Sequence, residues 1–155
     1  MLIYENIQEL DTFESFYSTP FMGNGNLIIP FINIGVSLHP INPNKSPLYL
    51  DKSYLVFFDA DIIAENGRYT RYCDPPKQTV TIGGISVSKL QHVELKLCFS
   101  SAFLQILPDT KKSEHFWIPI ATPNLPINMR TIEVDEFFKP EALPPNLASV
   151  LNIAN

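Results

Sequence analysis

The clearest alternation of apolar and polar residues lies between Lys89 and Phe99. Every second position is apolar, at Val93, Leu95, Leu97 and Phe99, and the positions between them hold His92, Glu94, Lys96 and Cys98. Side chains of a β-strand point to opposite faces with a period of two, whereas a helix would spread these apolar residues around its circumference. The segment therefore predicts a strand with one buried face and one wetter face.

Other segments repeat the period of two. They are residues 27–38, 54–63, 116–120 and 131–135, and a short extended piece is also expected over residues 69–72. In the first of them Pro30 cannot donate a ladder hydrogen bond, so we expect that strand to lie at a sheet edge or to begin after the proline. In the second, one face turns acidic at Asp59 and Asp61. We therefore expect one end of that strand to be covered on both sides and the other end to emerge into water.

Turns are predicted at two glycine-containing pairs. Asn66-Gly67 is a common two-residue hairpin turn. Gly83-Gly84 predicts a second hairpin, because folding the chain there matches apolar with apolar and hydroxyl with hydroxyl at four successive pairs. After Phe99 the apolar positions change from odd to even numbers. This change, at Ser100-Ser101, predicts a β-bulge, a strand crossing between sheets, or a tight turn.

Helical spacing is confined to two terminal segments. Residues 5–17 place apolar side chains three and four residues apart, with acids between them, which favours an amphipathic helix. Asn146 is expected to cap a short helix that carries Leu147, Val150 and Leu151. Strands separated by turns, without strand–helix–strand alternation, predict a single mainly β domain over residues 1–155. We expect an antiparallel β-sandwich or a strongly bent sheet with short terminal helices.

Composition narrows the class of partner. The charged fraction is 17% and 14 of the 155 residues are prolines, against averages of ~25% and ~5%. Because aromatic and β-branched residues remain plentiful, we interpret this as a compact body with proline-set loops. The net charge of −5 is concentrated near the two ends of the sequence, in residues 1–17 and 130–141. This distribution disfavours nucleic acid, which binds clustered lysine and arginine, and permits a basic partner.

The two cysteines, Cys73 and Cys98, do not have the spacing of a metal or redox motif. We expect two thiols in a reducing compartment, with a bridge between them as the alternative. The N-terminal residues lack the basic region and long apolar core of a signal peptide, and no apolar run suits a membrane span. These features predict a soluble, cytoplasmic protein that has no membrane partner.

Acid–base and metal chemistry has two weak candidates. His92 and Glu94 share a strand face and could share a proton or hold a metal, but a polar, solvent-facing strand surface is the favoured interpretation. Asp59 and Asp61, followed by Glu65, lack the loop pattern of a calcium site and are expected to keep a strand end soluble. We predict no metal, cofactor or catalytic residue, and we do not expect an enzyme.

Aromatic residues and arginines give the strongest candidate for a functional surface. Tyrosine, tryptophan and arginine dominate the hot spots of protein–protein interfaces. If such side chains gather on the non-core side, they form an apolar patch that a monomer rarely exposes. The alternative is a second layer of core beneath the terminal helices. The candidate binding residues are Trp117, Tyr69, Tyr72, Arg68, Arg71 and Phe57.

These observations predict a non-catalytic protein-binding domain that acts by surface occlusion, in the manner of an immunity or adaptor protein. Its surface would have an aromatic centre and an acidic rim. The first alternative is a homodimeric structural protein, in which the same patch closes the dimer. The second is a small-ligand-binding protein or a metal-dependent enzyme that uses His92 and Glu94, or Asp59 and Asp61.

Overall fold

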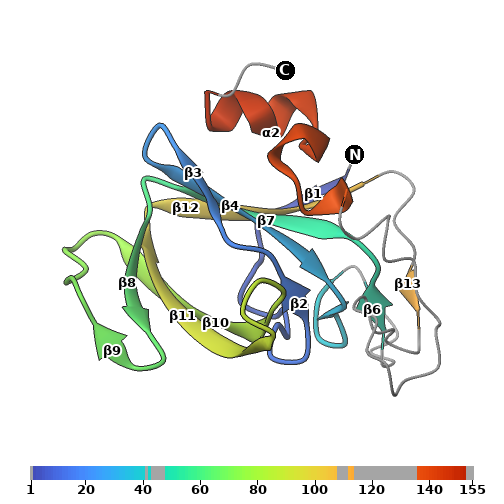
Figure 1. Cartoon of the computed structure of the whole chain (residues 1–155), viewed down its shortest axis with the longest axis horizontal. Helices are drawn as coiled ribbons and strands as arrows, with labels where there is room; N and C mark the ends of the chain where they lie inside the picture. The colour runs from blue at the N-terminus through green and yellow to red at the C-terminus, as the bar shows by residue number, and fades with distance from the viewer. Residues whose placement is uncertain (1, 41, 43–47, 108–111, 114–135, 153–155) are drawn as a thin grey trace.

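The computed structural model describes residues 2–40, 42, 48–107, 112–113 and 136–152. The described chain is mainly β, as predicted, with a short helical stretch near the C-terminus (Figure 1). The elements are β1 (Leu2–Tyr4), β2 (Phe16–Tyr17), β3 (Phe21–Gly23), β4 (Asn26–Ile32), β5 (Ile34–Gly35), β6 (Tyr49–Leu50), β7 (Ser53–Phe58), β8 (Asp61–Glu65), β9 (Arg68–Tyr69), β10 (Gln78–Ser86), β11 (Gln91–Phe99), β12 (Ser101–Ile106), β13 (Lys112–Ser113), the 3-10 helix η1 (Pro140–Ala142) and α2 (Pro145–Val150).

Most strands belong to one mixed sheet. Its order is β1-β12-β7-β4-β2-β10-β11-β8-β9, and β3 pairs with β4 outside this path. Among the described strands, β2 and β10 run parallel and the other pairs are antiparallel. A smaller sheet has the order β13-β6-β5. The longest ladder joins β10 and β11, from Gln78 opposite Phe99 to Ser86 opposite Gln91.

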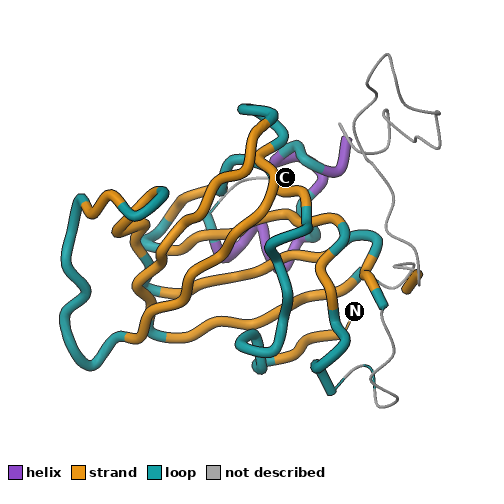
Figure 2. The backbone as a smooth tube through the Cα atoms, turned by 90° about the horizontal axis from the view of Figure 1, so that it is seen from below, coloured by secondary structure: helices purple, strands orange, loops and turns teal. Residues whose placement is uncertain are grey.

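The large sheet bends so that its two halves face each other across a buried core. In Figure 1, β3, β4, β7 and β12 form the upper layer, and β8, β10 and β11 form the lower one. One buried cluster takes Leu27 and Leu55 from the upper layer and Leu95 and Leu97 from the lower layer. A second cluster lies on the outer face of the upper layer, beneath α2. Figure 2 shows the helical segments on the far side of the strands.

The alternation in β11 is confirmed. Val93, Leu95, Leu97 and Phe99 are all buried in the main core, whereas His92 on the other face is exposed. The period of two therefore identified both the strand and its inner face.

The chain passes from one layer to the other at Asp59 and at Ser100. The predicted strand over residues 54–63 is two strands, β7 and β8, because Asp59 has a positive φ of 50° and ends the first ladder. After Phe99 the chain likewise leaves β10 and β8 and pairs with β7 and β1, so it crosses between the two layers of one sheet and not between separate sheets. The two crossings are joined, because the Ser100 N–H donates to the Phe58 carbonyl at 3.0 Å and the Ser100 hydroxyl donates to the Asp59 carboxylate at 2.9 Å.

The predicted hairpin at Gly83-Gly84 is wrong. Both glycines lie inside β10, opposite Glu94 and Val93, and the chain turns at residues 87–90. A Cβ atom on Gly83 would lie 2.6 Å from the ring of Phe13, so that ring would have to move, and one on Gly84 would lie 3.0 Å from the Thr12 carbonyl oxygen.

The symmetric order of apolar and hydroxyl residues on the two sides of these glycines has another cause. Val80 and Ile82 pack against the main core, whereas Ile85 and Val87 pack against the second cluster, beneath α2. The apolar phase changes because β10 faces one core before the glycines and the other core after them.

Residues 5–17 are not a helix. They run through turns into β2, and their backbone groups bond to other parts of the fold. Asp11 and Gly35 exchange two N–H···O bonds of 2.9 and 2.8 Å, and the Thr12 hydroxyl accepts a backbone N–H of β10 at 3.2 Å. The helical spacing does not correspond to one buried face, because Ile7 is buried while Phe13 is 48% exposed.

Pro30 lies in a central strand, so the expectation of an edge strand or a late start is wrong. The proline is tolerated because the neighbouring strand is interrupted beside it. β3 pairs with residues 26–28 of β4, and β2 pairs with residues 31–32. At the gap the Pro30 carbonyl still accepts the Ser18 N–H at 3.3 Å, and the N–H that proline lacks has no ladder partner to satisfy.

The predicted C-terminal helix is present as α2, but Asn146 is not its cap. Pro144 occupies the N-cap position and Asn146 lies within the first turn. Its side-chain amide instead exchanges two hydrogen bonds with buried Gln105, of 2.8 and 3.2 Å. Leu147 and Leu151 are buried, so this polar pair and an apolar face together hold α2 against the sheet.

Candidate protein-binding surface

The β8–β9 hairpin forms the last part of the large sheet, at the left of Figure 1. Asn66 and Gly67 have φ values of 49° and 81°, which is the left-handed conformation that a tight two-residue turn requires. Glu65 pairs with Arg68 across the turn. The hairpin predicted at Asn66-Gly67 is therefore confirmed, and it makes β9 an edge strand.

Four of the predicted binding residues lie together on this hairpin and the loop after it. We call Arg68, Tyr69, Arg71 and Tyr72 the arginine–tyrosine surface. Tyr69 is 59% exposed and Tyr72 is 92% exposed, and both arginines are exposed. Large aromatic side chains in this state have not been used by the fold to build its own core, so their apolar area remains free for contact with a partner.

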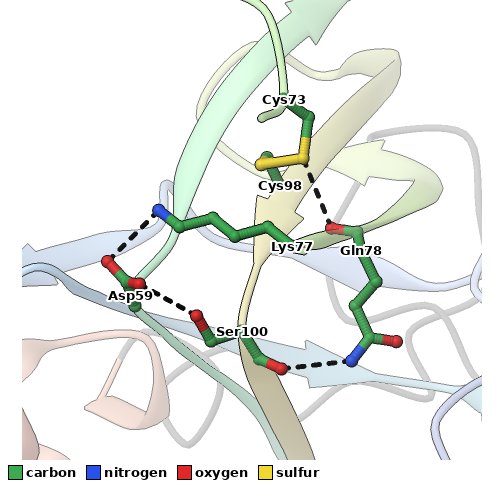
Figure 3. Close-up of a disulfide and its surroundings, with 6 residues drawn as sticks. All are labelled: Asp59, Cys73, Lys77, Gln78, Cys98 and Ser100. Atoms are coloured by element: carbon green, nitrogen blue, oxygen red, sulfur yellow. Dashed lines mark hydrogen bonds and ion pairs between the residues drawn. A yellow bond between two sulfur atoms is a disulfide. The ribbon is translucent and has the colours of Figure 1, made fainter. Parts of the chain in front are cut away.

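A disulfide ties the end of this surface to the body of the sheet. Cys73, directly after Tyr72, is bonded to Cys98 of β11, with a Cα–Cα distance of 5.5 Å (Figure 3). The expectation of two thiols is therefore wrong, and the bridge is the correct alternative. The Thr70 N–H also donates to the Ile63 carbonyl at 2.9 Å. The loop that carries Tyr72 is thus fixed at both ends.

Charged side chains contact Tyr69 and Arg71. The Lys96 ammonium donates to the Tyr69 hydroxyl at 2.8 Å and lies 5.2 Å from the centre of its ring, within cation–π range. Arg71 pairs with Asp61 at 2.9 Å. Among the described residues, no acid lies within ion-pair distance of Arg68. The charge of Arg71 is thus paired with a carboxylate, whereas the charge of Arg68 is exposed to solvent.

Two other predicted binding residues do not join this surface. Phe57 is fully buried in the main core, 5.1 Å from Phe99 between ring centres. It was misplaced because β7 is covered on both faces, so neither side of that strand is a non-core side. Trp117, with the predicted strands at 116–120 and 131–135, lies outside the described residues.

The His92 and Glu94 pair has no metal-binding geometry in the described part of the chain. The His92 ring stacks on Phe13, with 6.3 Å between ring centres, and its Nε2 lies 3.2 Å from the Phe13 carbonyl oxygen. Within the described residues no three histidine, cysteine or acidic side chains come close enough to hold a metal ion. The histidine here packs against the N-terminal segment.

The two aspartates near the sheet crossing serve different partners. Asp59 accepts the Ser100 hydroxyl and pairs with Lys77 at 3.2 Å (Figure 3), whereas Asp61 pairs with Arg71. The Ser100 hydrogen bond, and then the hydrogen bond and charge of Lys77, lower the pKa of the Asp59 carboxyl. Both carboxylates are therefore held by protein groups and fasten the loop before β10 to the sheet.

Sequence reasoning missed the β11 residues that hold this segment. Lys96 contacts Tyr69, and Cys98 is bonded to Cys73, both from the strand face opposite the main core. The alternation had placed both on that face, but only the spatial order of the strands reveals that β8 and the loop after β9 lie beside it.

The fold and this surface define a small, mainly β domain with a tethered aromatic hairpin at one sheet edge. No protein-family model, curated protein or solved structure matches the chain. In the described part of the chain, no helix has the length and hydrophobicity needed to span a membrane.

Proposed function

We propose that this chain is a non-catalytic protein-binding domain that acts by covering part of a partner protein with its arginine–tyrosine surface. The observation that carries the proposal is the exposure of Tyr72, at 92%, on a loop closed by a disulfide. Tyrosine and arginine are enriched among residues whose truncation costs a complex most. A tyrosine also supplies a large contact area with few rotatable bonds.

Pre-organisation is the second support. The hairpin turn, the bridge to Cys98 and the contact between Lys96 and Tyr69 all restrain the surface before any partner arrives. A loop that is already ordered loses less conformational entropy on binding, so more of the contact energy appears as affinity. A mobile loop with the same residues would bind more weakly.

The disulfide also bears on the compartment. Disulfides form and persist in oxidising surroundings and are rare in the cytosol. We therefore propose that the protein acts in an oxidising compartment, in place of the cytoplasmic location expected from its sequence. Measuring free thiols in protein taken directly from its source cells tests this. If two cysteines of the folded protein react with an alkylating agent, the cytoplasmic location is the correct account.

Photo-cross-linking tests the binding surface directly. A benzophenone amino acid at position 72 is compared with the same group at position 22, because Met22 is also exposed, at 62%, and lies on β3. After irradiation in the source cells, position 72 should yield one cross-linked protein that position 22 does not. Equal products from both positions, or none from position 72, would remove this surface as the binding site.

The same experiment separates the alternatives. If the product at position 72 is a second copy of this chain, and light scattering at low concentration gives a stable dimer, the homodimeric structural protein is the correct account. If His92→Ala abolishes a ligand-binding or enzymatic activity of the protein and Tyr72→Ala keeps it, the ligand-binding or enzymatic account replaces the proposal.

A further inference from the structure

A cleft of about 420 Å³ lies beside β12, and none of its lining residues belongs to the arginine–tyrosine surface. It is present because β1 is shorter than its partner. β1 pairs only with residues 104–106, whereas β12 begins at Ser101. The chain leaves the sheet after Tyr4, and Glu5 and Ile7 form one wall of the cleft. Ala102 and Phe103 lie on the opposite side.

The backbone of Ala102 points into this opening, as the alternation of the strands requires. The Ser18 N–H donates to the Pro30 carbonyl, so even-numbered residues of β4 face β2 and odd-numbered residues face β7. The β4–β7 and β7–β12 registers then fix the directions in β12. The backbone N–H and C=O groups of its odd-numbered residues point toward β7, and those of its even-numbered residues point toward the other edge. There Leu104 pairs with Tyr4, but no described strand lies opposite Ala102.

The remaining lining adds apolar contact and negative charge. Phe58, Phe99 and Phe103 line the cleft together with Ala102. Glu5 is exposed at its wall, and the N-terminal segment that supplies this wall carries further exposed acids and no base over residues 2–17. Figure 3 shows the side-chain amide of Gln78, also in the lining, donating to the Ser100 carbonyl at 3.1 Å. This bond ends the open stretch of the strand edge next to Ala102.

We propose that this cleft binds a short, extended, basic peptide segment of a partner protein, which adds to β12 at Ala102 and extends the line of β1. An incoming residue would exchange two backbone hydrogen bonds with Ala102, as in other cases of strand addition. Its neighbouring apolar side chain would contact the phenylalanines. A lysine or arginine would approach Glu5, since complementary charge selects the partner and its orientation.

The probe is the peptide acetyl-Val-Lys-Val-Lys-Val-amide, titrated into the ¹⁵N-labelled, disulfide-bonded full chain. The matched control is acetyl-Val-Glu-Val-Glu-Val-amide. We expect the basic peptide to cause saturable shifts centred on the Ala102 amide and to slow its hydrogen exchange. The acidic peptide should bind at least about tenfold more weakly. Absence of saturable shifts at Ala102, or equal affinity for the two peptides, would overturn the proposal.

Charge variants give a second readout. Glu5→Lys should abolish the preference for the basic peptide, whereas Glu9→Lys makes the same charge change on the same segment, outside the lining of this cleft, and should keep it. If both variants weaken binding equally, the peptide responds to overall charge and the proposed site is wrong. If sedimentation shows a dimer that the peptide cannot dissociate, the edge is closed by a second copy and the proposal also fails.

The lining of this cleft shares no residue with the arginine–tyrosine surface. Tyr72→Ala should leave peptide binding unchanged, and Glu5→Lys should leave cross-linking from position 72 unchanged. Failure of one proposal is therefore distinguishable from failure of the other.

Discussion

Breaking the Cys73–Cys98 bridge tests how the arginine–tyrosine surface is held in place. Cys73→Ser is the sharper change, because Cys73 is partly exposed while Cys98 is only 4% exposed and its thiol can remain as a small buried group. The bridged residues are 25 positions apart. Closing a loop of that length removes chain entropy from the unfolded state equivalent to about 3.5 kcal/mol at 25 °C.

Urea unfolding followed by circular dichroism measures this difference. We compare the oxidised protein, the same protein with reductant, and Cys73→Ser without reductant. The last two should agree with each other and lie about 3.5 kcal/mol below the first, with Tm lower by roughly 10 °C. A loss below about 1 kcal/mol would refute the reasoning, because the unfolded chain would then be restricted even without the bridge.

Two further substitutions test the sheet and its crossing. Gly84→Val should lower the free energy of unfolding by about 1–3 kcal/mol, because a Cβ there would lie 3.0 Å from the Thr12 carbonyl oxygen; unchanged urea stability would contradict the close approach. Ser100 and Lys77 lower the pKa of Asp59, so its stabilising contribution is complete above the unfolded pKa of about 3.9 and is lost as pH falls through the lower folded value. Asp59→Asn should therefore make the urea midpoint less sensitive to pH below about 4, whereas an unchanged pH profile would show that the carboxylate contributes nothing.

Features that depend on neighbours in the chain could be predicted from the sequence. The inner face of β11 follows from alternation alone, because the four apolar side chains at alternate positions from 93 to 99 all pack in the same core. The turn at Asn66-Gly67 follows from the freedom of both residues to adopt positive φ. The four residues of the arginine–tyrosine surface lie within five positions, 68–72, so their proximity follows from the sequence, and their role in binding stays a prediction.

Features that depend on distant segments could not be predicted. A two-residue turn and a continuous strand that changes core give the same pattern around Gly83 and Gly84, and only the unbroken pairing of β10 with β11 distinguishes them. The N-terminal segment has helical spacing, yet its backbone hydrogen bonds go to Gly35 and β10. Tertiary contacts override a local pattern in both cases.

The site residues divide in the same way. Phe57 belongs to a strand covered on both faces, which an alternating pattern with apolar residues on both sides does not reveal. The bridge requires two segments to meet at a Cα–Cα distance of 5.5 Å, and no spacing between Cys73 and Cys98 encodes that approach. The cleft at Ala102 depends on a mismatch in length between β1 and β12, which is visible only when the two strands are paired.

The affinity of the cross-linked partner for Tyr72→Ala is the most direct test of the central claim that the tethered aromatic hairpin is the binding surface. Isothermal titration calorimetry compares this variant with Met22→Ala, which truncates an exposed apolar side chain elsewhere. Loss of a hot-spot residue costs about 2 kcal/mol or more, so we predict that Kd rises about 30-fold for Tyr72→Ala and stays within about twofold for Met22→Ala. Equal Kd values for the two variants, both folded and disulfide-bonded, would contradict the account.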